Sequence, residues 1–169
     1  MILDLKDISV NQGAVLPFKY ELNLGDVSFC GDCPFPEPFK VNGEVANHAG
    51  VLELSAVAST NAHYKCSRCA REFTEHFEVP IFRVLAKEVT ENSDDDTIEI
   101  AGNVLDADSV VREAVVLNTD MVHLCKPDCK GLCQSCGKDL NTGECNCKHD
   151  NVDPRLAALK QLLDNDDYQ

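Results

Sequence analysis

Ten cysteines in a chain of 169 residues constrain its fold more than any other feature of the sequence. The first ten residues contain Asp4 and Asp7 where a secretory signal would be positive, and no later stretch has the length of a membrane span. We therefore expect a soluble, cytoplasmic protein, in which disulfides are rare and cysteine pairs indicate a metal. The ten form five close pairs: Cys30 and Cys33, Cys66 and Cys69, Cys125 and Cys129, Cys133 and Cys136, and Cys145 and Cys147.

The last two pairs are predicted to form one zinc site. A Cys-x-x-Cys turn can direct both sulfurs to one ion at roughly 2.3 Å, and two pairs complete a tetrahedron. Gly137 follows Cys136 directly, and glycine permits the left-handed backbone that lets neighbouring amides point at the sulfurs. Cys145 and Cys147 complement Cys133 and Cys136 if they lie on a strand, because residues two apart on a strand project to one face.

Six cysteines lie between residues 125 and 147, whereas one zinc ion takes four ligands. The surplus pair, Cys125 and Cys129, is predicted to join Cys66 and Cys69 in a second site that ties the cluster to the rest of the chain. The alternative is that Cys125 or Cys129 shares the cluster zinc while another cysteine stays free. The expected cofactor is thus one or two structural zinc ions.

The other candidate ligands form no clear site. Cys30 and Cys33 would need two further ligands, and none of the five histidines lies at motif spacing. The run from Cys129 to Cys136 matches the three-cysteine motif of radical enzymes that use an iron–sulfur cluster, but those enzymes need a large barrel and few residues follow the motif here. An iron–sulfur cluster of another kind is the alternative to zinc.

The hydrophobic pattern predicts an α+β fold, with a mainly antiparallel sheet, two helices and a C-terminal cysteine-rich extension. Residues 39–87 are rich in β-branched and aromatic residues that partly alternate, as in an antiparallel sheet. One helix is predicted after an N-cap at Asp106 or Asp108, and a second after Asp153 and Pro154. The apolar positions of the first are Val110, Val111, Ala114, Val115 and Leu117, and those of the second are Leu156, Leu159, Leu162 and Leu163.

These elements divide the chain into two parts. Residues 1–120 are predicted to form a β-rich body that ends in the first helix, with only short strands in residues 1–37. Residues 121–169 are predicted to contain the zinc-binding cysteine cluster and the C-terminal helix. Eight acids and no base lie between Glu88 and Asp108, which predicts an acidic, solvated loop near 88–108, with a candidate short strand at 97–100.

The formal net charge is −14, from 15 Lys and Arg against 29 Asp and Glu. Binding to nucleic acid phosphates requires clustered Lys and Arg, so this charge opposes tight, non-specific attachment to RNA or DNA. Each tetrathiolate zinc site adds about −2, because its ligands bind deprotonated. A basic protein partner therefore fits the charge better than direct contact with RNA.

The cysteine sites predict that the protein is not an enzyme. A catalytic zinc keeps one position open for water, whereas a site of four cysteines is closed. The sequence contains no His-Glu-x-x-His helix, no phosphate-binding glycine loop, and no Ser or Cys with an evident His partner. The alternative function is a zinc-thiolate redox sensor, in which oxidation of the thiolates to disulfides releases the metal.

The cysteine-rich end resembles the YceD family of large ribosomal RNA subunit accumulation proteins. The likeness covers roughly residues 40–163 and includes Cys66-Ser-Arg-Cys69, where that family has its own Cys-x-x-Cys. It implies a bacterial or plastid, non-enzymatic ribosome-biogenesis factor whose gene commonly lies beside one for a large-subunit ribosomal protein. The implied partner is a large-subunit assembly intermediate or a basic ribosomal protein, with no membrane. The most specific residues are Cys125-Lys-Pro-Asp-Cys-Lys-Gly-Leu-Cys-Gln-Ser-Cys-Gly-Lys-Asp-Leu-Asn141, Cys145-Asn-Cys147 and Asp153-Pro-Arg-Leu-Ala-Ala-Leu159.

Overall fold

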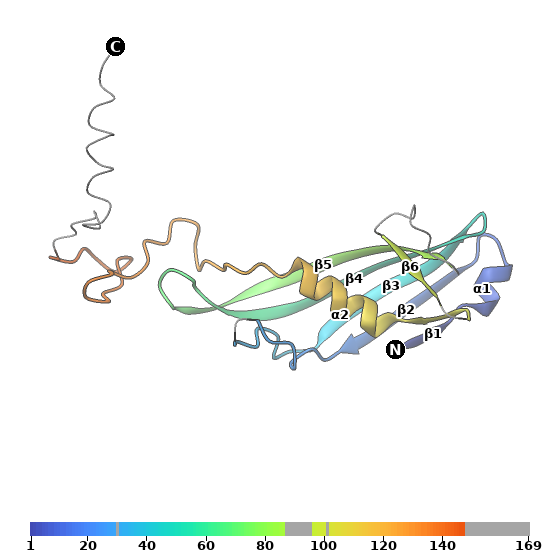
Figure 1. Ribbon diagram of the computed structural model, residues 1–169, viewed down its shortest axis with the longest axis horizontal. Coiled ribbons are helices and arrows are strands. Elements are labelled where there is room, and N and C mark those ends of the chain that lie inside the picture. Colours follow the sequence, from blue (N-terminus) through green and yellow to red (C-terminus); the bar gives the residue numbers. More distant parts are fainter. Residues whose placement is uncertain (30, 87–95, 101, 148–169) are drawn as a thin grey trace, which may run out of the picture.

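The protein is built on a five-stranded sheet, as the computed structural model shows for residues 1–29, 31–86, 96–100 and 102–147 (Figure 1). The strands lie in the order β2-β3-β4-β5-β6; β2 to β5 pair antiparallel, and β6 pairs parallel with β5. The predicted α+β class with a mainly antiparallel sheet is confirmed. The strands are β2 (Val15–Leu22), β3 (Phe39–His48), β4 (Val51–Lys65), β5 (Glu72–Ala86) and β6 (Thr97–Glu99).

Two short strands and two helices complete the described fold. The strands β1 (Ile2–Asp4) and β7 (Val104–Asp106) pair with each other in a separate two-stranded sheet. The helices are α1 (Lys6–Val10), which the sequence did not predict, and α2 (Ala107–Asn118), which is the first predicted helix. The strand expected at 97–100 is present as β6. The second predicted helix, with Asp153 and Pro154, lies outside the described residues.

The hairpin of β4 and β5 places Cys66 and Cys69 far from the middle of the sheet. Both strands have 15 residues, and their pairing runs from Leu52 opposite Leu85 to Lys65 opposite Glu72. Along β4, buried and more exposed residues alternate over nearly its whole length, as expected for a strand with one face against the core. The six residues between the strands, 66–71, form the hairpin tip.

Helix α2 packs on β5 and covers part of the sheet (Figure 1). The N-cap is Asp106, whose carboxylate accepts a hydrogen bond from the Asp108 amide at 3.2 Å, so one of the two predicted caps is observed. The prediction that Leu117 belongs to the buried stripe is wrong, because its side chain is 69% exposed. At 3.6 residues per turn, Leu117 lies about 90° from the centre of the buried face. The four other predicted positions, Val110, Val111, Ala114 and Val115, are buried.

Aromatic side chains hold the segment between β2 and β3 against the half of the β4–β5 hairpin that lies nearer its tip. Phe35 is fully buried, with its ring centroid 5.0 Å from that of Phe39 and 5.2 Å from that of Phe77. The Pro34 carbonyl accepts a hydrogen bond from the His63 amide of β4 at 2.8 Å. This packing brings residues just before Pro34 beside the end of β4.

Across the described ranges, no helix is long and apolar enough to span a membrane.

Candidate metal centres

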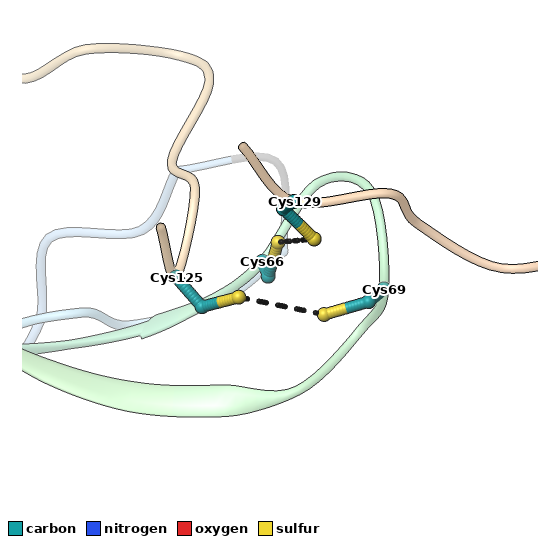
Figure 2. A group of neighbouring side chains, drawn as sticks. All are labelled: Cys66, Cys69, Cys125 and Cys129. Atoms are coloured by element: carbon teal, nitrogen blue, oxygen red, sulfur yellow. Dashed lines mark hydrogen bonds between the residues drawn. The ribbon is translucent and has the colours of Figure 1, made fainter. Parts of the chain in front are cut away.

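Four cysteines from two distant segments meet at the hairpin tip and form centre I (Figure 2). Cys66 and Cys69 come from the tip itself, whereas Cys125 and Cys129 come from the irregular segment that follows α2. All four Sγ atoms lie within 4.8 Å of one another. Cys66, Cys69 and Cys129 are buried, and Phe73 and Leu124 pack against them. Centre I is thus a nearly enclosed cluster of four sulfurs.

The sulfur spacing in centre I fits a tetrahedral metal ion. The Sγ atoms of Cys66 and Cys129 are 3.7 Å apart, and those of Cys69 and Cys125 are 3.6 Å apart. Zinc bonds to sulfur are about 2.3 Å long, so a tetrahedron of thiolates has edges of about 3.8 Å. A disulfide would require about 2.0 Å between the sulfurs. The arrangement therefore suits a thiolate-bound metal better than a pair of disulfides.

The backbone of the hairpin tip is shaped around the Cys66 sulfur. Ala70 adopts a left-handed conformation with φ of 57°, and its amide donates to the Cys66 carbonyl at 2.9 Å. A hydrogen bond from the Cys125 backbone amide, followed by those of Cys69 and Arg68, lowers the pKa of Cys66 to about 6 against the effect of burial. Burial and the neighbouring sulfurs raise the pKa of Cys125 to about 12. A divalent cation would remove this conflict, because it stabilises all four thiolates together.

Side chains outside centre I support it through a chain of hydrogen bonds. Asn141 donates from Nδ2 to the Cys129 sulfur at 3.4 Å. Asp139 accepts at Oδ1 from the backbone and side-chain amides of Asn141 at 2.8 and 2.7 Å. The Arg71 guanidinium donates to Oδ2 of Asp139 at 3.0 Å, which returns the chain of contacts to the hairpin tip. Such outer contacts orient metal ligands and tune their basicity.

The segment after Cys129 is also clamped directly to the tip. Arg68 donates to the Cys129 carbonyl at 2.9 Å, and the Arg68 carbonyl accepts from the Leu132 amide at 3.1 Å. Gly131, between Cys129 and Leu132 in the sequence, has φ of 74°, and a Cβ there would be 3.0 Å from the Arg68 carbonyl oxygen. This close approach is the structural reason for a glycine.

Centre II contains the other four predicted ligands, Cys133, Cys136, Cys145 and Cys147, whose sulfurs also lie within 4.8 Å of one another. The predicted turn geometry is confirmed: Gly137 has φ of 72°, and the Cys136 amide points at the Cys133 sulfur at 3.4 Å. This amide is the largest cause that lowers the pKa of Cys133 to about 6.

The predicted strand for Cys145 and Cys147 is wrong, because both residues lie in irregular structure. Lys138 holds this segment instead, since its ammonium donates to the Glu144 carbonyl at 2.7 Å. Hydrogen bonding with Cys136, followed by burial, raises the pKa of Cys147 to about 12. Centre II is more open to solvent than centre I, because only Cys133 is buried and Cys136 is exposed.

The structure thus brings the eight predicted cysteines together in two quartets, with Cys125 and Cys129 beside Cys66 and Cys69 and not in centre II. Metal binding by these quartets stays a prediction. Cys33 is exposed and apart from both centres, and Cys30 lies outside the described residues. Among the described histidines none joins a quartet. The contacts of Asn141, Asp139 and Arg71 were missed, because residue spacing gives no signal for them.

Comparisons with known proteins find one family and several relatives. The model of the family "Large ribosomal RNA subunit accumulation protein YceD" matches residues 54–163. The chain is 29% identical over 118 residues to an uncharacterized protein of Mycobacterium tuberculosis, covering 68% of this chain and 56% of that protein. It is 28% identical over 132 residues to the uncharacterized protein YlbN of Bacillus subtilis, covering 77% of each.

A plant relative has a functional name. The chain is 25% identical over 158 residues to the "Large ribosomal RNA subunit accumulation protein YCED homolog 1, chloroplastic" of Zea mays, covering 75% of this chain and 54% of the relative. The chain therefore spans about half the length of the maize and mycobacterial relatives. No solved structure matches the chain. Because the family model matches well over half of its residues and includes all eight clustered cysteines, the chain belongs to the YceD family.

Proposed function

We propose that this protein is a non-enzymatic ribosome-biogenesis factor that supports accumulation of large-subunit ribosomal RNA and holds two structural zinc ions. The family description and the name of the maize relative support the role in RNA accumulation. The observation that supports a structural and not a catalytic metal is the ligand set, which is four cysteines in each centre. Such a site is closed, because no coordination position is left for water or substrate.

Zinc suits these centres because thiolate ligands in a tetrahedron favour zinc over the harder divalent ions. In centre I, Cys66 and Cys69 would fix the hairpin tip, and Cys125 and Cys129 would fix the chain that leaves α2. In centre II, the four cysteines would fold a loop of fifteen residues that has no regular secondary structure. The metal would supply the cross-links that a short segment without its own core needs.

The charge of the protein favours a protein-mediated role in the ribosome pathway. The net charge of −14 would attract a basic ribosomal protein, or a large-subunit assembly intermediate that presents one. Direct RNA contact is a weaker proposal for the same reason. In a bacterium we expect such a factor in the cytoplasm, away from the membrane, whereas the maize relative is named as chloroplastic.

The test is a deletion strain complemented with variants. We expect the deletion to lower large-subunit RNA relative to small-subunit RNA in sedimentation profiles, and wild-type protein to restore the ratio. The double variant Cys66→Ser and Cys69→Ser should fail to restore it, whereas Asn42→Ser, at an exposed position of β3 outside both centres, should succeed. A deletion strain with a normal subunit ratio contradicts the proposed function.

One observation favours the redox sensor as a second candidate function. Centre II has an exposed cysteine, Cys136, next to the buried Cys133 whose thiolate is stabilised by a backbone amide. Exposed thiolates are the ones that peroxide oxidises first. The sensor predicts zinc release from centre II before centre I at low peroxide, followed in a zinc-release assay. Unchanged zinc occupancy under these conditions rejects it.

A further inference from the structure

A pocket of about 710 Å³ lies beside centre I, in the size range of ligand sites, about 300–1,000 Å³. Its walls are the turn residues 28, 29 and 32–34, the end of β4, the start of β5, and the segment that follows α2. We call it the hairpin pocket. Two hydrogen bonds tie the segment after α2 to the hairpin tip. The Ser67 amide donates to the His123 carbonyl at 2.8 Å, and the His123 amide donates to the Ser67 hydroxyl at 3.2 Å.

The hairpin pocket combines aromatic faces with carboxylates. The imidazole of His123 stacks on the Tyr64 ring, with centroids 3.5 Å apart and planes at 12°. The carboxylates are those of Asp32, Glu72 and Asp120. Lys65 is the one Lys or Arg among the described residues that line it, and its ammonium is 3.0 Å from Asp32. Three carboxylates against one ammonium leave a formal charge of −2, with the histidines neutral.

The surroundings make the pocket more negative. Four thiolates with one divalent ion in centre I would add about −2 on the other side of Ser67. Burial, then Glu75 and Asp120, raise the pKa of Tyr64 to about 12. The Tyr64 hydroxyl is buried and has no hydrogen-bond partner within the described ranges. The pocket therefore offers several acceptors, and among its described lining residues Lys65 alone is permanently cationic.

An apolar rim borders this acidic pocket. Met121 lines the pocket and is 81% exposed, and the adjacent Val122 is 65% exposed. Lysine and arginine have long apolar stems below their charged ends, and these stems pack on such surfaces. Aromatic faces also attract lysine and arginine through cation–π contacts. The rim and the walls thus match both parts of a basic side chain.

We propose that the hairpin pocket binds a lysine- or arginine-containing segment of a basic protein, with Asp32, Glu72 and Asp120 facing its cationic groups. This inference rests on the proposed function, because it locates the partner that the ribosomal role requires. Aromatic faces alone would also suit unstacked RNA bases, but the carboxylates repel phosphates. The C-terminal residues 148–169 are an unsuitable occupant, since three Lys and Arg against five Asp give them a charge of −2.

Fluorescence anisotropy with labelled probes tests the proposal on the full, zinc-loaded protein. The probes are a short peptide of alternating arginine and glycine, the same peptide with glutamine for arginine, and a short single-stranded RNA. We expect the arginine peptide to bind and the other two not to bind. Binding of the RNA without the arginine peptide overturns the proposal in favour of a nucleic-acid site.

A matched pair of variants separates the pocket from general surface charge. The variant Glu72→Gln with Asp120→Asn removes two exposed carboxylates of the pocket, and Asp7→Asn with Glu99→Gln removes two exposed carboxylates elsewhere. The pocket variant should bind the arginine peptide at least about fivefold more weakly, and the control within about twofold of wild type. Equal loss in both overturns the proposal, provided that zinc content and circular dichroism show both to be folded.

The same variants distinguish failure of this inference from failure of the proposed function. A pocket variant that loses the peptide and also fails to restore the RNA ratio in the deletion strain supports both. If the protein binds no peptide but the deletion strain still loses large-subunit RNA, the pocket proposal is overturned. The proposed function then stands. A deletion strain with normal subunit ratios contradicts the function whatever the peptide does.

Discussion

Replacing Asn141 with leucine should weaken metal binding at centre I without touching a ligand. The Asn141 side chain donates to the Cys129 sulfur at 3.4 Å, and its Oδ1 accepts from the Lys130 amide at 3.0 Å. Leucine has a similar size but makes neither hydrogen bond, so the Cys129 thiolate loses a donor and the segment loses an anchor. Loss of an outer contact of this kind typically lowers metal affinity about 10–100-fold. That range corresponds to about 1.4–2.8 kcal/mol of binding free energy.

The assay is cobalt titration against a chelator of known affinity, followed by the sulfur-to-cobalt absorption bands. Amide signals of Ser67 and Gly137 in NMR spectra assign each binding step, because these residues adjoin centres I and II respectively. The control is Asn42→Leu, which changes an exposed asparagine of β3. An affinity of centre I within twofold of wild type would refute the reasoning.

The same contact couples the two centres. Asn141 lies between Cys136 and Cys145, in the loop that centre II closes, yet its side chain acts on centre I. Disabling centre II with Cys133→Ser and Cys136→Ser should therefore weaken centre I by a similar factor. Adding Asn141→Leu to that variant should then have little further effect, since both changes remove one interaction. Full additivity of the two losses would show that the centres are independent.

Three further predictions concern stability. Removal of metal by a chelator should release about two zinc ions per chain, counted by mass spectrometry, and lower the melting temperature, measured by calorimetry. Release of about one ion per chain would contradict one of the two centres. Gly131→Ala should lower the free energy of unfolding in urea by about 1–3 kcal/mol, and by more than Gly137→Ala does. Both glycines have positive φ, but only a Cβ at Gly131 would meet the Arg68 carbonyl oxygen. Val111→Ala should cost about 2 kcal/mol, whereas Leu117→Ala should stay within about 0.5 kcal/mol; equal losses would contradict the observed face of α2.

Local sequence signals predicted much of the fold. The alternation in β4 and the cap at Asp106 were readable because each depends on residues two to four apart. The limit of such signals is visible at Leu117, where helical spacing gave the wrong face near the end of α2. It is also visible at Cys145, where the two-residue spacing fits a strand but the Lys138 contact with Glu144 holds an irregular segment.

The sequence by itself determined that this chain has five cysteine pairs and that a Cys-x-x-Cys turn can direct two sulfurs to one metal ion. It also determined a net charge that excludes a generally basic surface. Only the tertiary structure decided which pairs meet. The sulfurs of Cys66 and Cys129 are 63 residues apart in sequence and 3.7 Å apart in space, because the β4–β5 hairpin extends its tip to the segment that leaves α2. The Asn141 contact and the hairpin pocket depend on the same approach of distant segments, which no local pattern encodes.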